Sequence, residues 1–194
     1  MRTGRLFGMR VLGWLALGLI LAFITFAVAN AQGEDERFMP KGGRTLLLES
    51  LGAQPGVDEF RRIASSRNTD AQWEAFVAGR AVPAGAREKA TLAAYLSVNM
   101  PLPEKALASL QPGKLADVLP RDGRELAWQQ CQFCHSLYSS HLTQRRDVQG
   151  WRNMFLSPFH RELKMTPQER EEFARYSAIN MPMNTDDVPK DLRF

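Results

Sequence analysis

The chain is poor in the residues that build structural metal sites. Its 194 residues contain two cysteines and three histidines. A structural zinc site needs four ligands, usually from two separated pairs, whereas this chain has one cysteine pair, at residues 131 and 134. The histidines at 141 and 160 also lack the paired spacing of zinc ligands. A zinc-stabilised fold is therefore excluded, and two cysteines in an exported protein would by default form a disulfide.

The sequence also lacks strand-like segments, because no run of β-branched residues alternates with polar ones. Gly and Pro instead separate segments with helical character, so we predict an all-α fold. Thr166 with Glu169 three residues later is a capping-box start, and Pro167 suits the first helical position. The expected helices are 43–51, 70–79, 86–98, 123–132, 148–156 and 166–179.

Acidic residues are absent from the first 31 residues, which contain three arginines and an almost wholly apolar run at 11–28. The run ends before Ala29-Asn30-Ala31, a small-x-small pattern typical of signal-peptidase sites. We predict a signal peptide over 1–31 and a periplasmic protein. The alternative is that residues 11–28 are retained as an anchor in the inner membrane. Without the three arginines the formal charge falls from +4 to +1, which argues against a nucleic-acid partner.

Two segments of the chain resemble each other in three ordered blocks. Residues 40–46 match 120–126 at an offset of 80, and Trp73 matches Trp151 at 78. Tyr95 matches Tyr176, and the sequence Asn-Met-Pro at 99–101 matches the same sequence at 180–182, both at an offset of 81 residues. We therefore predict two copies of one small helical unit. The predicted units are a first copy at 38–103, a linker at 104–118, a second copy at 119–184 and a C-terminal tail at 185–194.

Both cysteines lie in a C-x-x-C-H motif, formed by Cys131, Cys134 and His135. Two thiols this close can both reach one edge of a porphyrin, and the adjacent imidazole can bind the iron. A thioredoxin-like dithiol would need a βαβ setting, which is missing here. We predict one covalent haem c with His135 as the proximal iron ligand. The matching segment of the first copy, 51–57, has no Cys or His, so we expect that copy to be haemless.

The second copy resembles the small bacterial class I cytochromes c, such as the haem subunit of periplasmic sulfite dehydrogenases. The residues that carry this resemblance are the C-x-x-C-H motif, Arg146-Asp147, Gly150-Trp151, Thr166 to Glu169, Tyr176 and Asn180-Met181-Pro182. The resemblance implies a cytochrome c-like helical domain and one-electron transfer. It also implies a redox partner protein, either a periplasmic molybdenum oxidoreductase or another cytochrome.

The sixth iron ligand is where the sequence departs from this group, whose members usually place a methionine shortly before the last helix. Residues 158–160 occupy that window and include no methionine. His160 falls inside it, and imidazole is a common haem ligand, so we predict coordination by two histidines. Met154 and Met165 are the alternative ligands.

The predicted function is electron transfer, by a carrier or by the electron-accepting subunit of an oxidoreductase. No catalytic constellation is evident beside the haem motif. The alternative is a haem enzyme that acts at an open iron position on a peroxide or a sulfur compound. A haem-based sensor, whose first copy binds a partner protein, is a third hypothesis.

Overall fold

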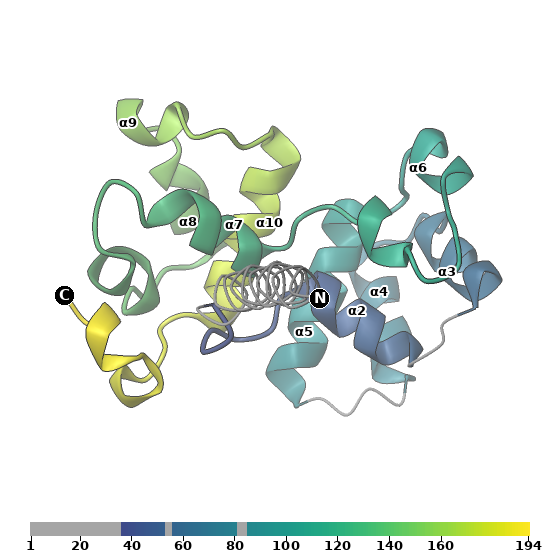
Figure 1. The fold of residues 1–194 in the computed structure, drawn as a ribbon, viewed down its shortest axis with the longest axis horizontal. Helices are drawn as coiled ribbons and strands as arrows, with labels where there is room; N and C mark the ends of the chain where they lie inside the picture. Colours follow the sequence, from purple (N-terminus) through teal and green to yellow (C-terminus); the bar gives the residue numbers. More distant parts are fainter. Residues whose placement is uncertain (1–35, 53–55, 81–84) are drawn as a thin grey trace, which may run out of the picture. The chain divides into compact units, whose positions relative to one another are not determined.

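Helices and connecting loops make up the described part of the chain (Figure 1). The computed structural model describes residues 36–52, 56–80 and 85–194, and these contain no strand. The all-α prediction is therefore confirmed. The predicted signal peptide or anchor lies outside the described residues. Within the described ranges, no helix is long and apolar enough to cross a membrane.

The six predicted helices are present with ends within two residues of those expected. The helices are α2 (Gly43–Leu51), α3 (Val57–Ala64), α4 (Asp70–Ala78), α5 (Ala86–Asn99), α6 (Glu104–Ala108), α7 (Gly123–Cys131), α8 (Val148–Met154), α9 (Pro158–Arg161) and α10 (Pro167–Asn180). The six expected helices did not include α3, α6 and α9, of which α6 lies in the segment predicted as the linker. Single turns of 3₁₀ or π type add Leu115–Val118, Tyr138–Leu142, Thr185–Asp187 and Lys190–Leu192.

Side-chain caps set the beginnings of the helices that matter most for the site. At α7, the Asp122 carboxylate accepts a hydrogen bond from the Glu125 amide, and the Glu125 side chain accepts one from the Asp122 amide. Thr166 and Glu169 form the same reciprocal box at α10, as the sequence predicted. Such caps satisfy amides that have no partner within the helix.

Each half of the chain has its own apolar core, and α5 packs against α10 between them (Figure 1). We call residues 38–118 the first half and residues 119–194 the second half. Trp73 is buried in the first core and Trp151 in the second. The same two helices therefore connect both cores.

The contacts between the halves are reciprocal. The Tyr95 hydroxyl donates to the carbonyl of Pro120 (2.8 Å), and the Tyr176 hydroxyl donates to the carbonyl of Pro40 (2.6 Å). Each tyrosine also packs against a glycine on the first turn of a helix in its own half. A Cβ atom on Gly43 would overlap Tyr95, and one on Gly123 would overlap Tyr176.

A buried acidic side chain, Glu172 of α10, links three helices. Its carboxyl accepts hydrogen bonds from the Gly123 amide at the start of α7 (3.1 Å) and from the Asn99 side chain at the end of α5 (3.2 Å). Burial, and then the nearby carboxyl of Asp122, raise the pKa of Glu172 to about 8. The folded chain therefore favours the protonated form of this group.

The tyrosine–glycine contacts predict that Gly43→Ala and Gly123→Ala each destabilise the fold. We expect each change to lower the free energy of unfolding by about 1–3 kcal/mol, because the added methyl group overpacks the core. Gly56→Ala is the control, since nothing lies within 4 Å of the added Cβ, and its effect should stay within about 0.5 kcal/mol. Urea unfolding measures all three; equal effects at the three positions would contradict the packing argument.

The raised pKa of Glu172 predicts that stability falls as the pH rises. The unfolded chain loses this proton near its ordinary pKa of 4.5, whereas the folded chain keeps it until about pH 8. Burial lowers the pKa of His141 to about 3, which has the opposite effect on stability below the ordinary histidine pKa of 6.5. Unfolding free energy should therefore decrease mainly above about pH 6.5, until the folded chain also loses the proton near pH 8, at about 1.4 kcal/mol per unit of pKa difference.

Glu172→Gln tests this, because the amide retains an acceptor for Gly123 but has no charge. Most of the decrease should be missing in this variant. Glu171→Gln is the matched control, since the Arg152 side chain holds the pKa of Glu171 below its usual range. If Glu172→Gln loses stability across this pH range as steeply as the native chain, the buried carboxyl is not the cause.

Candidate functional site

Helix α7 carries the C-x-x-C-H motif at its end. Cys131 is the last residue of the helix, and Cys134 and His135 follow in the turn. Cys131 is partly buried and Cys134 exposed, and both cysteines are unpaired. Because the start of α7 is held by Asp122 and Glu172, the position of the motif follows from contacts made nine residues earlier.

A cavity of about 320 Å³ opens beside this turn. It brings together four residues that the sequence analysis singled out, namely Cys131, Cys134, His135 and His160. The alternative ligand Met154 also lines it, whereas Met165 is not among the lining residues and is buried in the second core. The remaining lining residues are Gln130, Ser140, His141, Trp151, Ser157, Phe159, Leu163 and Phe173.

Two histidines from different segments approach each other in this cavity. The ring centres of His135 and His160 are 6.0 Å apart, with the ring planes at 89°. His160 lies on α9, a single turn that begins at Pro158. Its Nδ1 atom is 3.1 Å from the Met154 carbonyl oxygen, so Nδ1 donates there and Nε2 remains the available nitrogen.

His141 forms part of the inner wall, and the sequence analysis gave it no role. Its Nε2 atom lies 2.8 Å from the Ser177 hydroxyl, and its ring packs against Trp151 and Phe173 at 5.1 and 5.2 Å between centres. Burial, and then the charge of Arg146, lower the pKa of His141 to about 3. The imidazole is therefore neutral at physiological pH.

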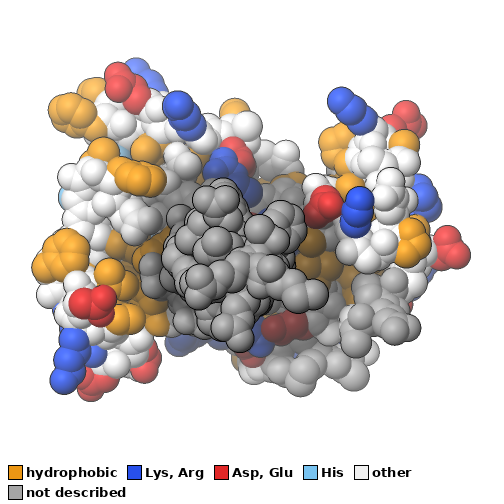
Figure 2. Space-filling view, viewed as in Figure 1, with side chains coloured by type: hydrophobic (Ala, Val, Ile, Leu, Met, Phe, Trp, Pro, Cys, Tyr) orange, Lys and Arg blue, Asp and Glu red, His pale blue; other side chains and the backbone are white. Residues whose placement is uncertain are grey.

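A second hollow of about 300 Å³ shares Cys134 and His135 with the cavity. It is lined largely by apolar side chains, namely Trp128, Phe133, Leu137, Tyr138, Leu142, Leu192 and Phe194. The large hydrophobic side chains exposed in the described ranges, Phe133, Leu156, Phe159 and Phe194, all belong to the second half. Figure 2 shows hydrophobic side chains at the surface around α9. An apolar surface of this kind suits a large apolar ligand or a partner protein.

Comparison with known proteins adds no assignment. No family model, curated protein or solved structure matches this chain. The chemistry of the site therefore follows from its own residues. The cavity is lined by two thiols and three imidazoles. Within the described ranges, no three His, Cys, Asp or Glu side chains converge on a point that could hold a bare metal ion.

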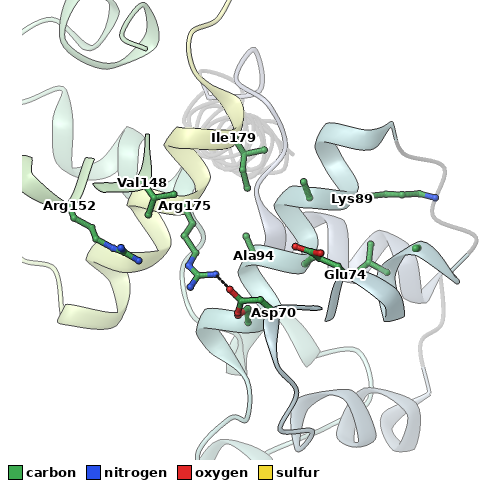
Figure 3. A pocket seen from close by; sticks show the side chains of 13 residues that line it. Asp70, Glu74, Lys89, Ala94, Val148, Arg152, Arg175 and Ile179 are labelled. Carbon is green, nitrogen blue, oxygen red and sulfur yellow. Dashed lines mark hydrogen bonds and ion pairs between the residues drawn. The ribbon is translucent and has the colours of Figure 1, made fainter. Parts of the chain in front are cut away.

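The chain has a larger groove of about 630 Å³, between α4 and α5 on one side and α8 and α10 on the other (Figure 3). Arg175 of α10 points across it to Asp70 at the start of α4 (2.9 Å). Arg175 and Arg152 also pair with Glu171. The lining residues of this groove include no Cys or His. The groove therefore lacks the thiol and imidazole groups that mark the smaller cavity.

The two thiols should differ in reactivity in the unmodified chain. Burial raises the pKa of Cys131 to about 12, whereas Cys134 is exposed. Because the thiolate is the nucleophile, we expect iodoacetamide to alkylate Cys131 at least about tenfold more slowly than Cys134 at pH 8. The rates can be measured separately in Cys134→Ala and Cys131→Ala. Equal rates in the two variants would show that Cys131 is not shielded as described.

Proposed function

We propose that the chain is an exported electron-transfer protein with one covalently bound haem c. Cys131 and Cys134 hold the porphyrin through thioether links. His135 is the proximal iron ligand, and His160 is the distal ligand. The fit rests on the donor set, because two thiols and three imidazoles line one cavity. His141 is hydrogen-bonded to Ser177, so His135 and His160 are the imidazoles that would bind the iron.

The approach of the two histidines carries this proposal. A bond from a transition metal to an imidazole nitrogen is about 2 Å long. The ring centre lies roughly 1 Å behind the nitrogen, so two imidazoles on one ion have centres on the order of 6 Å apart. The centres of His135 and His160 are 6.0 Å apart. This spacing is compatible with two ligands of one iron, although an ordinary edge-to-face contact between rings has a similar spacing.

The setting of His160 supports its role as a ligand. Metal-binding histidines usually donate the second ring N–H to a carbonyl or carboxylate, which fixes the ring orientation. The Met154 carbonyl accepts such a bond from His160 Nδ1. Met154 therefore acts through its backbone carbonyl in this proposal, and its side-chain sulfur is not needed as an iron ligand.

Haem supplies a one-electron couple whose potential depends on the axial ligands and on burial. His135 and His160 would both bind the iron in this proposal, and the group would serve electron transfer and not substrate binding. The buried side chains of Trp151 and Phe173 form an apolar part of the cavity wall. The exposed Phe133 lies between the two cysteines, where a redox partner could approach the haem edge. That partner is a periplasmic molybdenum oxidoreductase or another cytochrome.

Visible and near-infrared spectra of the protein, expressed with a haem-attachment system, test the proposal. We expect a six-coordinate low-spin ferric spectrum with a near-infrared band typical of two nitrogen ligands. His160→Ala should convert the ferric protein to a high-spin form with an open iron position, because a nitrogen ligand is lost.

Met154→Leu is the matched control, since it removes the thioether but keeps the carbonyl that holds His160. Its spectrum should match that of the native protein. A band typical of methionine bound to iron would contradict the role of His160. A high-spin native protein would favour an enzyme acting on peroxide or a sulfur compound, and the absence of covalent haem would overturn the whole proposal.

A further inference from the structure

The side chain of Glu172 is a buried acidic group that the proposed function does not use. It is 2% exposed, and within the described ranges it takes part in no ion pair. The donors to its carboxyl are the amide of Gly123 and the side chain of Asn99, both neutral. Because an ionised carboxylate is costly to bury without an opposite charge, such a group is a candidate for a functional role.

A second buried carboxyl, that of Asp122, acts on Glu172. Asp122 is fully buried, and its carboxylate accepts hydrogen bonds from the amides of Glu125 and Arg44 at the beginnings of two helices. These donors stabilise the ionised form of Asp122, and its negative charge favours the protonated form of Glu172. The counterpart of Asp122 in the first half is Gly42, which has no side chain. Glu172 is therefore the member of this pair that holds a proton.

The first half shows that packing alone does not require an acid at this place. At an offset of 81, Glu172 corresponds to Thr91. The contacts agree, because the Asn180 side chain donates to the Thr91 hydroxyl (2.9 Å) as the Asn99 side chain donates to Glu172. A neutral hydroxyl is thus sufficient for this contact between helices. The acidic side chain belongs to the half that contains the C-x-x-C-H motif.

Helix α10 connects this carboxyl with the cavity. Phe173, the next residue, lines the cavity, whereas Glu172 faces α5 and α7. An α-helix with its side chains is about 10 Å across, so the carboxyl lies on the order of one helix width from the cavity. In a protein interior, a unit charge at this distance changes the pKa of a carboxyl by about one unit. A change of one charge in the cavity therefore acts on Glu172.

We propose that Glu172 is a redox-linked proton site. Its carboxylate takes up one proton from water when an electron from the redox partner reaches the haem, and the carboxyl releases this proton when the electron leaves. The proposal rests on the proposed function, because the electron supplies the change of charge. One electron and one proton enter together, so the net charge of the buried region does not change. Since buried charge is costly, the two events favour each other.

The other charged and titratable groups around α10 provide a constant background. They are Asp122, Arg124 and Glu125 at the beginning of α7, Arg44 of α2, Tyr95 of α5, His141, Arg152 of α8, and Glu171 and Arg175 of α10 itself. The arginines stay cationic, and burial raises the pKa of Tyr95 well above its ordinary value. Glu125 and Glu171 are paired with arginines, and His141 is neutral. We therefore expect the moving proton on Glu172.

The first test is infrared difference spectroscopy of the native full chain with haem covalently attached. Oxidation at pH 7 should remove the carbonyl band of one protonated carboxylic acid, and reduction should restore it. This band should be missing from the difference spectrum of Glu172→Gln. Glu171→Gln is the matched control and should retain the band, because Glu171 is paired with Arg152 and Arg175.

The second test compares midpoint potentials from pH 5 to pH 9. We expect the native potential to fall with rising pH over about one pH unit, the difference between the pKa values of Glu172 in the two redox states. The slope should not exceed one proton per electron. Glu172→Gln and Glu172→Thr, which restores the residue of the first half, should lose most of this dependence, and Glu171→Gln should keep it.

The outcomes separate the two proposals. A native protein without covalent haem would overturn the proposed function and the proton site together. Covalent haem with a native potential that does not change with pH would overturn the proton site alone, and this measurement does not depend on whether a variant folds. So would an infrared band and a pH dependence that persist in Glu172→Gln and Glu172→Thr.

Discussion

One buried carboxylate, that of Asp122, accepts hydrogen bonds from the first turns of two helices, and the arrangement of both halves depends on it. Asp122 accepts hydrogen bonds from the Glu125 amide of α7 and from the Arg44 amide of α2. The N-terminal ends of both helices favour a negative charge. Position 42, which corresponds to 122, is a glycine, and a Cβ there would overlap the Asp122 carboxyl. Two aspartates could not occupy this space, so the two halves must differ here.

The same hydrogen bonds position the C-x-x-C-H motif. With its beginning held by Asp122 and Glu172, α7 ends at Cys131 in a defined place relative to α10. The first half contributes to this through Asn99, which donates to Glu172. The first half has no Cys or His at the corresponding position, but its Asn99 helps to position the motif of the second half. This gives the first copy a structural role that needs no ligand of its own.

The sequence predicted the elements with strong local signals and missed those that depend on tertiary packing. The capping box of Thr166 and Glu169 acts within one helix, so the beginning of α10 could be predicted. Helix α3 lacks a side-chain cap and was missed. Glu172 follows another glutamate in a charged segment, and only the packing of α10 against α5 and α7 buries it. Likewise, the approach of His160 to His135 depends on how α9 folds back over the motif.

The differences between the halves separate the scaffold from its chemistry. Residues that hold the helices together are the same at corresponding positions, as with the glycine–tyrosine contacts and the buried tryptophans. The cavity wall of the second half has both shared and different side chains. Trp151 has the counterpart Trp73, whereas His141 and Met154 stand where the first half has Ile63 and Phe76, all at an offset of 78. Because substitutions of buried residues usually destabilise a fold, the shared tryptophan and the glycine–tyrosine contacts maintain the packing around a wall whose other side chains differ.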